Sequence, residues 1–424
     1  MPKKNNFINQ FMVDIRVGRF LATRDLRRSN IWTTSLIVFV MMLTFLNLVV
    51  VGGILVGLIQ GAIDAHVKYG TGDLQISPLA DRSAIQHTPQ IIDIVKQLPG
   101  YKNHVVRYFG GAQIESNYRA TIDPRTTRDM VSATLMGINP DQERIFSDIN
   151  TKMMEGKFLD NSDVDSVIVG KNLLAKYTPI NDPSFKNLKN VDVGSKILIT
   201  SNGVSKEYVV KGVMRSKVDF DMAVTMVDSE VRRLQNQTDF NASRISVHLK
   251  PGFDSARAVQ QLLDMGVGEW ARVQVSMDAI PKTVKDMKDT FDVLGMLLSV
   301  IGLAVSSITI FIVIFVNAIT RRRYIGILKG IGITHRAIEI SYVAQAIFYA
   351  ILGSGIGIAT VFLFIKPFIA AHPIDFPFSD GILVADATGA LLRAGVLIAS
   401  TIVAGFIPAR IIIKQNTLSA ILGR

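Results

Sequence analysis

The sequence predicts an α-helical membrane protein with four transmembrane helices, arranged as one plus three, and a large extracytoplasmic α+β domain inserted after the first. Apolar residues cluster in four stretches of about 20 or more residues, the length needed to cross a bilayer. Positive charge is concentrated in short segments outside those stretches, and a long segment of mixed α and β character separates the first stretch from the second. The four stretches are 34–60, 293–319, 340–365 and 383–407.

The distribution of charge predicts the orientation. Residues 1–30, the loop at 321–339 and the C-terminal tail together contain 15 basic and 3 acidic residues, whereas residues 61–290 contain 29 basic and 28 acidic residues. Lys and Arg concentrate in cytoplasmic loops. Both termini and the 321–339 loop are therefore expected in the cytoplasm. The formal charge of +11 is a topology signal, and no nucleic-acid partner is expected.

This organisation gives nine segments in chain order. They are an amphipathic cytoplasmic helix at 1–30, transmembrane helix 1 at 31–60, an extracytoplasmic domain with a helical stalk at 61–290, transmembrane helix 2 at 291–320, a cytoplasmic coupling element at 321–338, transmembrane helix 3 at 339–366, an outer loop at 367–382, transmembrane helix 4 at 383–408 and a cytoplasmic tail at 409–424.

The N-terminal segment is expected to be a surface helix followed by a membrane anchor. Ile8, Phe11, Met12 and Ile15 follow the spacing of one helical face, which predicts an amphipathic helix on the inner membrane surface. About 30 residues precede the span and its apolar run is too long for a signal peptide, so we expect a retained anchor.

The segment 61–290 alternates strand and helix patterns and is long enough for two subdomains, the second inserted in the first. Its ends continue helically from the adjacent spans, and a helix from Pro281 to Ile319 would be about 58 Å long. β-Branched runs predict strands, and helical periodicity predicts helices between them. The expected strands are 72–77, 105–116, 133–138, 165–170, 195–200, 207–214, 222–227 and 243–249, and the expected helices are 88–98, 171–177 and 253–265.

Sequence signatures of catalysis are missing from the chain. It has no phosphate-binding G-x-x-x-x-G-K-[ST] loop, no H-E-x-x-H and no G-x-S-x-G, and its six histidines show no ligand spacing. There is no cysteine, so packing alone must hold the outer domain. We expect no enzyme activity, no metal and no cofactor in this chain.

The loop between the second and third apolar stretches reads RRRYIGILKGIGITHRAI, residues 321–338. Its apolar residues form one helical stripe, and its glycines fit a place where the backbone turns or another surface approaches closely. Thr334 is a candidate N-cap for the next helix. The segment is expected to present a short structured knob, although a topogenic anchor without a partner explains the arginines equally simply. The stripe comprises Tyr324, Ile327, Leu328, Ile331, His335 and Ile338.

This loop resembles the R-E-I-G-I-L-K-A-I-G-A-[ST] signature of FtsX-like ABC transporter permeases, the group that includes MacB and the lipoprotein-releasing LolC and LolE. The closing AGFIPARIIIKQNTLSAIL resembles the same family's C-terminal pattern, and MGINPDQE, VGSKILI and YVVKGVMRSKVDFD resemble pieces of its periplasmic core domain. Three positions depart from the pattern, namely Tyr324 and Gln345, where glutamate is usual, and Asn416-Thr417 in place of Asn-Pro. An ATPase contact made by a glutamate at these positions is therefore in question for this chain.

The resemblance implies a permease subunit of the bacterial inner membrane that works by mechanotransmission. A separate cytoplasmic ABC ATPase would bind ATP and Mg²⁺, a second permease chain would pair with this one, and a lipoprotein or another extracytoplasmic substrate would be handled outside the bilayer. The residues expected to contact the ATPase are Arg322, Arg323, Tyr324, Gly326, Ile327, Leu328, Lys329, Ile331 and Gly332.

Three other functions stay open on the residues alone. An FtsX-type regulator of a cell-wall hydrolase has the same architecture, usually with a smaller outer domain. A membrane-anchored receptor or adhesion protein would not need three further spans. A membrane-anchored hydrolase would need a catalytic constellation, and none is apparent in the sequence.

Overall fold

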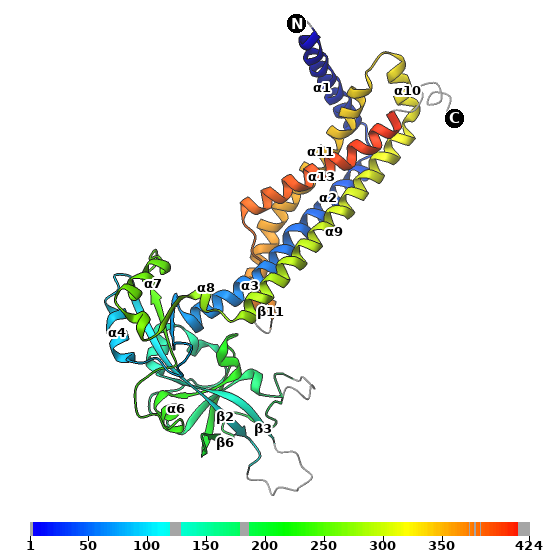
Figure 1. The fold of residues 1–424 in the computed structure, drawn as a ribbon. Coiled ribbons are helices and arrows are strands. Elements are labelled where there is room, and N and C mark those ends of the chain that lie inside the picture. The colour runs from blue at the N-terminus through cyan, green and yellow to red at the C-terminus, as the bar shows by residue number, and fades with distance from the viewer. Residues whose placement is uncertain are drawn as a thin grey trace. The chain divides into compact units, whose positions relative to one another are not determined.

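The computed structural model describes residues 3–118, 129–178, 186–372, 374–376, 379–381 and 383–413. The chain divides into two compact units (Figure 1). One contains residues 1–59, 286–375 and 380–424, and the other contains residues 60–285 and 376–379. The predicted tail at 409–424 lies largely outside the described residues, as does Asn416-Thr417.

The first unit is helical. Among the described residues, four helices are long and apolar enough to cross a membrane, and they run over Ile31–Thr71, Lys282–Thr320, His335–Ala371 and Ala387–Ile411. The first contains π-helical turns at η1 (Asn47–Val51) and η2 (His66–Thr71). The elements are α1 (Lys3–Arg27), α2 (Ile31–Leu46), α3 (Gly52–Ala65), α9 (Lys282–Thr320), α10 (Arg322–Gly330), α11 (His335–Thr360), η7 (Val361–Ile365), α12 (Lys366–Ala371) and α13 (Ala387–Ile413), with a short hairpin of β11 (Ile374–Phe376) and β12 (Ser379–Gly381) before α13.

Small residues bring the helices of this bundle close together. A Cβ on Gly353 of α11 would lie 2.5 Å from the Met41 Cβ of α2, and a Cβ on Gly357 would lie 2.5 Å from the Phe45 ring. Met41 and Phe45 are fully buried. Close backbone approach of this kind is how helices associate within a bilayer, where no hydrophobic effect drives them together.

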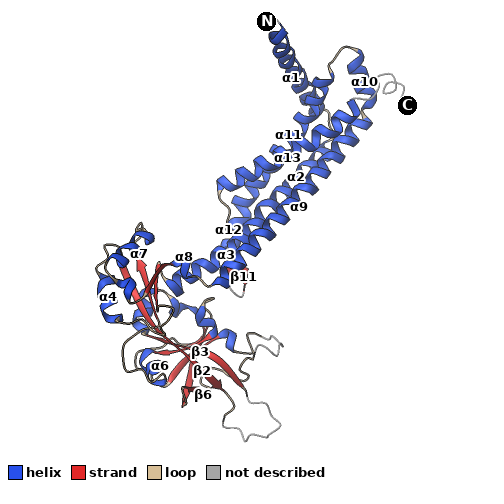
Figure 2. Cartoon of the chain, viewed as in Figure 1, coloured by secondary structure: helices blue, strands red, loops and turns tan. Residues whose placement is uncertain are grey.

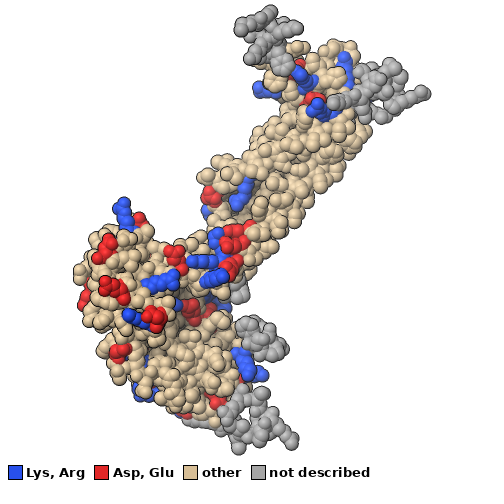
Figure 3. All heavy atoms as spheres, in the orientation of Figure 1, with Lys and Arg blue, Asp and Glu red and all other residues tan. Residues whose placement is uncertain are grey.

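The outer surface of the bundle matches a hydrocarbon environment. Exposed apolar side chains follow α9 through its length, from Val293 to Ile319. On the face shown in Figure 3, the middle of the bundle has no charged side chain. An uncharged apolar girdle of this kind is typical of helices that face lipid.

The second unit is built on a sheet whose described strands run in the order β10-β1-β9-β2-β3-β8-β5-β7-β4, with β6 paired to β2 and β7 (Figure 2). Its helices pack against this sheet: α5 against β2, α6 against β2, β3 and β8, and α7 against β10. The strands are β1 (Leu74–Ser77), β2 (Tyr101–Glu115), β3 (Met130–Ile138), β4 (Met153–Gly156), β5 (Ser166–Gly170), β6 (Lys196–Ser201), β7 (Val204–Met214), β8 (Ala223–Val227), β9 (Arg244–Leu249) and β10 (Arg272–Val275), and the helices are α4 (Thr88–Lys96), α5 (Pro140–Phe146), α6 (Asp228–Leu234), α7 (Ser255–Asp264) and α8 (Ser276–Ala279).

The long strand β2 joins the two halves of the sheet. Its residues Tyr101–Arg107 pair with β9, and Tyr108–Glu115 pair with β3. One apolar cluster extends across both halves, from Leu74 through Leu135 and Ile197 to Val247, all fully buried. The two predicted subdomains are thus halves of one sheet that share β2 and a core.

Most predicted elements of this unit are confirmed, and one is wrong. Residues 171–177 were expected to be helical, but only a 3-10 turn at Lys171–Leu173 forms. Leu174 is extended and buried and bridges to Leu188, because pairing it into the core outweighs its local helix preference. The strands β4 and β10 and the short helices α5, α6 and α8 were not predicted.

The first long helix ends in the second unit against a buried arginine. Arg107 of β2 donates hydrogen bonds of 2.7 Å to the carbonyl oxygens of Tyr69 and Gly70, in the last turn of that helix. Ser246 of β9 donates a further bond to the Gly70 carbonyl at 2.7 Å. Carbonyls at a helix end lack partners within the helix. The sheet therefore supplies the missing donors and fixes the helix end.

Candidate coupling site

The loop at 321–338, which we call the inner loop after its predicted cytoplasmic position, begins with α10 and ends in a tight reversal before α11. The Gly332 N–H donates to the Lys329 carbonyl at 3.0 Å, and the Ile333 N–H donates to the Leu328 carbonyl at 3.1 Å. This pair of bonds, with Gly332 at a φ of +91°, is a Schellman motif. Thr334 then caps α11 by accepting a hydrogen bond from the Ala337 N–H at 3.2 Å, as predicted.

The structure corrects the orientation of the predicted apolar stripe. Leu328 is only 8% exposed and Ile325, which the stripe omitted, only 3%, and both pack into the core of the helical unit. Gly326 is buried as well, and Tyr324 is half-buried against the same core. The buried face of α10 is rotated by about a quarter of a turn from the predicted stripe, because the sequence pattern of α10 does not show which side the bundle covers.

Lys329 is also turned toward the chain itself. Its Nζ donates to the carbonyl oxygen of Ile413, at the C-terminal end of α13. Burial lowers the pKa of Lys329, as expected for an amine removed from water. A cation at a helix C-terminus also interacts favourably with the helix dipole. Lys329 therefore holds α10 to α13 in this structure.

Of the described residues expected to contact the ATPase, four are exposed, and Gly330 among them in the chain is exposed as well. We call these five residues the loop patch: Arg323, Ile327, Gly330, Ile331 and Gly332. Ile331 is 71% exposed and Ile327 is 50% exposed. The side chain of Arg322 lies outside the described residues. Two exposed isoleucines beside a cation and two glycines form a knob on which another protein surface can approach the backbone closely.

The helix α1 holds the loop at both of its ends, a relationship that sequence reasoning missed. At one end, the Asp14 carboxylate accepts a hydrogen bond of 2.6 Å from the Thr334 hydroxyl. At the other, Asp25 lies 3.2 Å from the Arg321 guanidinium and accepts a longer bond, of 3.5 Å, from the Gln345 amide. Burial raises the pKa of Asp25, although Arg321 and Gln345 oppose that shift.

A glycine explains how α1 approaches so closely. A Cβ on Gly18 would lie 2.7 Å from Ile340 Cγ2 and 2.8 Å from the Ala337 carbonyl. Asp14, Gly18, Leu21 and Ala22 form one buried face at helical spacing. Of the residues predicted to face the inner membrane surface, Phe11 and Met12 are exposed and Ile15 is half-buried, while the side chain of Ile8 lies outside the described residues; the membrane contact stays a prediction. The signal available in the sequence was a small residue between two carboxylates, not an apolar stripe.

Two family models match this chain. Residues 34–265 match the MacB-like periplasmic core domain, and residues 296–417 match the FtsX-like permease C-terminal family. The first match alone covers more than half of the chain. The chain belongs to the FtsX-like permeases that carry a MacB-like periplasmic core domain. It is a MacB-like permease, a multi-pass protein of the inner membrane.

Curated relatives of this permease include the macrolide export ATP-binding/permease proteins MacB of Escherichia coli O157:H7 and Shigella flexneri. Each is 31% identical over 129 residues, which is 30% of this chain and 20% of the relative. The match thus spans about one fifth of the length of these relatives.

Among solved structures, the periplasmic region of MacB from Actinobacillus actinomycetemcomitans is similar at 15% identity and a TM-score of 0.34, covering 52% of this chain and 95% of that structure. The extracellular domain of the transporter YknZ, from Gram-positive bacteria, is similar at 16% identity and a TM-score of 0.31, covering 47% of this chain and 97% of that domain.

Proposed function

We propose that this permease works by mechanotransmission. A separate ABC ATPase binds ATP and Mg²⁺, docks on the loop patch and moves α10, and the long helices pass that movement to the outer domain. Two permease chains pair in the working complex, with both termini in the cytoplasm. The substrate is handled outside the membrane.

One observation supports this proposal above the others. The helix α9 runs without interruption over Lys282–Thr320 and ends at the residue before the inner loop. It follows β10 in the chain, the last of the ten described strands in the sheet of the second unit, which we call the outer unit after its predicted extracytoplasmic position. At 1.5 Å per residue the 39 residues of α9 span about 58 Å, nearly twice the hydrocarbon thickness. Because this helix is continuous, we propose that it passes a displacement at α10 to the outer unit.

The anchoring of the inner loop supports the same mechanism. Asp14 and Asp25 tie its two ends to α1, and Lys329 ties its middle to α13. Movement of α10 is therefore shared with two other helices of the unit. A loop that served only to anchor the chain in the membrane would need the arginines but none of these internal bonds.

The names of the relatives and the family resemblance indicate two substrate classes. The curated relatives are named for macrolide export, which makes efflux of an apolar small molecule the first substrate class to test. Release of lipoproteins is the second, on the resemblance of the chain to the lipoprotein-releasing permeases.

The test is to co-express the chain with its ATPase and measure both co-purification and the stimulated ATPase rate. Ile331→Asp places a charge in the proposed contact, and an unpaired charge in an interface typically costs several kcal/mol. We expect recovery of the ATPase and its stimulation to fall by more than about tenfold. Ile145→Asp is the matched control, because Ile145 of the outer unit is 72% exposed and Ile331 is 71% exposed.

Normal recovery and stimulation with Ile331→Asp would show that the loop patch does not bind the ATPase. Leu328→Asp is not a useful variant for this question. Leu328 is buried in the bundle, so a carboxylate there would disturb folding whether or not a partner docks.

A further inference from the structure

The two faces of α1 differ in charge as well as in burial. Its two described carboxylates, Asp14 and Asp25, lie on or beside the face that packs on the bundle and are bonded there to Thr334 and Arg321. The arginines of α1, and Arg28 directly after it, are all exposed. Among the described residues none of them lies within 4 Å of a carboxylate oxygen, although Arg24 and Arg28 interact with Asp25 at longer range. We call this set the arginine strip: Arg16, Arg19, Arg24, Arg27 and Arg28.

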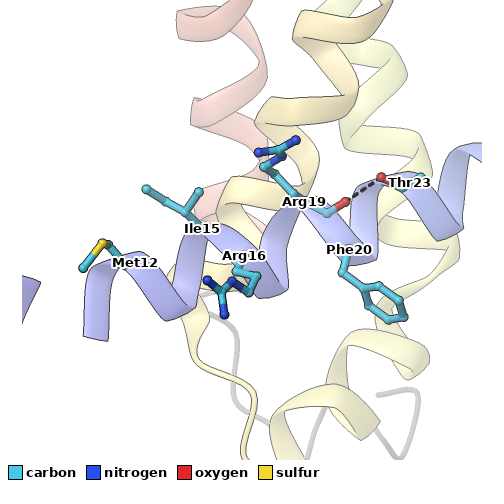
Figure 4. A pocket seen from close by; sticks show the side chains of 6 residues that line it. All are labelled: Met12, Ile15, Arg16, Arg19, Phe20 and Thr23. Carbon is cyan, nitrogen blue, oxygen red and sulfur yellow. Dashed lines mark hydrogen bonds between the residues drawn. The ribbon is translucent and has the colours of Figure 1, made fainter. Parts of the chain in front are cut away.

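Apolar side chains lie between these arginines. Phe20 is 66% exposed and Met12 is 56% exposed. Together with Ile15, Arg16, Arg19 and Thr23 they line a shallow hollow of about 430 Å³ on the helix (Figure 4). Arg16 and Phe20 are four residues apart and therefore lie on the same side of α1. A surface with alternating guanidinium and apolar groups suits a ligand that is anionic at one end and apolar at the other.

The position of a tryptophan indicates the depth of this surface. Trp32, in the first turn of the first membrane helix, is 84% exposed. Tryptophan at the end of a span is typical of the headgroup region, where its ring is apolar and its N–H is hydrated. Arg27 and Arg28 lie only five and four residues before it. The C-terminal end of the arginine strip is therefore within reach of lipid phosphates.

We propose that the arginine strip of α1 binds the headgroups of anionic phospholipids in the adjacent leaflet, with Phe20 and Met12 inserted among the acyl chains near the headgroups. Since α1 is bonded to both ends of the inner loop, the bound lipid holds the loop at a fixed depth. This proposal does not depend on what docks on the loop patch.

The alternative occupant is an acidic protein surface, including that of the ATPase. The mixture of arginine with exposed Phe20 and Met12 favours lipid. In a basic amphipathic helix beside a span, the basic side chains attract anionic headgroups and the apolar side chains insert at the acyl boundary. Binding of a protein partner to the arginine strip in place of lipid would overturn the proposal.

The test measures lipid binding to the purified full-length chain in a neutral detergent by native mass spectrometry. The probes are phosphatidylglycerol and phosphatidylcholine with the same acyl chains. We expect phosphatidylglycerol to bind at least about tenfold more tightly. Loss of one arginine's hydrogen bond to a headgroup phosphate should lower the affinity on the order of fivefold. The variant Arg16→Gln/Arg19→Gln/Arg27→Gln should therefore lose roughly a hundredfold in phosphatidylglycerol affinity.

Two control variants accompany this measurement. Lys250→Gln/Arg257→Gln/Arg272→Gln removes the same charge from exposed positions of the outer unit and should change nothing. Arg16→Lys/Arg19→Lys/Arg27→Lys keeps the charge and should keep most of the preference. Inorganic phosphate at millimolar concentration should not displace the lipid.

Three results would overturn the proposal. The first is equal binding of the two lipids by the wild type, and the second is unchanged phosphatidylglycerol binding by the glutamine variant. The third is loss of ATPase recovery in that variant with lipid binding intact, which would assign the arginine strip to a protein partner. Ile331→Asp should lose the ATPase and keep the lipid, so failure of the proposed coupling mechanism can be told apart from failure of this proposal.

Discussion

Arg107 and Glu143 form an ion pair from which solvent is almost completely excluded. Arg107 Nε lies 2.6 Å from Glu143 Oε1, Nη2 lies 2.9 Å from Oε2, and the two side chains are 1% and 0% exposed. The same guanidinium also donates to the last carbonyls of the first long helix. One side chain thus connects that helix to β2 and, through Glu143, to α5.

Removing the arginine should destabilise the outer unit severely. Arg107→Met leaves Glu143 buried without its counter-charge, and loss of one partner of a buried pair typically costs 3–5 kcal/mol. The chain has two tryptophans, so a Trp32→Phe background leaves Trp270 of the outer unit as the fluorescent reporter of urea unfolding. We expect the double variant Arg107→Met/Glu143→Leu to be at least about 1 kcal/mol more stable than Arg107→Met alone. A double variant as unstable as the sum of both single variants would show that the pair is not coupled.

The stability of the outer unit should depend on Asp73 in a pH-sensitive way. Burial alone would raise the pKa of Asp73, but hydrogen bonds from His248 and from the Leu249 N–H outweigh it, so the pKa is lowered. A carboxyl with a lowered pKa in the folded state stabilises that state above its unfolded pKa, near 4, and stops doing so as the pH falls through the folded value. Asp73→Asn should therefore be less stable than the wild type by about 1.5 kcal/mol at pH 6.

That difference should shrink as the pH is lowered from 5 toward 3, because the wild-type carboxyl also becomes neutral. The measurement is the free energy of urea unfolding of both chains in the Trp32→Phe background. A difference that stays constant over this range would mean that Asp73 acts through its shape and not through its charge.

The two glycines at the end of α10 should respond differently to alanine. Gly332 has a φ of +91°, which costs an L-residue about 1 kcal/mol, whereas Gly330 is helical and a Cβ there would meet nothing within 4 Å. Gly332→Ala should speed amide hydrogen exchange at Ile333 by about fivefold, since that N–H closes the Schellman motif. Gly330→Ala should leave exchange unchanged or slow it. Equal effects of the two variants would exclude a conformational role for Gly332.

The orientation of the chain is predicted from its charge distribution and is directly testable. Reporter fusions at Asp192 and at Gly332 should fall on opposite sides of the membrane, with Gly332 in the cytoplasm. Residues 321–339 carry five basic residues and one acidic residue, which is the bias that orients membrane helices. A cytoplasmic signal from both fusions would contradict the arrangement of one span, an outer domain and three spans.

Local chemistry explains what could be predicted of the outer unit. The predicted strands at 195–200 and 207–214 became β6 and β7, which are joined by Asn202-Gly203 with φ values of +47° and +78°. Asn-Gly favours this two-residue hairpin turn, so a closer reading of the sequence would have placed both strand ends correctly. Asn139-Pro140 likewise begins α5 with a side-chain cap and a proline in the first turn, a signal of a helix start that was overlooked.

The features that could not be predicted from the sequence depend on contacts between distant segments. The position of Leu328 on one side of a short helix is visible in the sequence, but which side is covered depends on the bundle that α10 packs against. Asp14 and Thr334 are 320 residues apart, and no local pattern pairs them. The buried position of Arg107 is hidden for the same reason, because a charged residue within a strand is most often exposed.

The main segment of the outer unit, residues 60–285, enters and leaves its sheet on neighbouring strands. Its incoming strand β1 and its outgoing strand β10 are antiparallel neighbours, with Leu74 opposite Val275, and the Thr71 and Ser276 hydroxyls lie 3.0 Å apart beside them. A domain whose two ends meet can be inserted into or removed from a host without changing the path of the host's helices. Such a junction is suited to exchange by recombination: relatives could acquire new outer domains while keeping the same membrane helices.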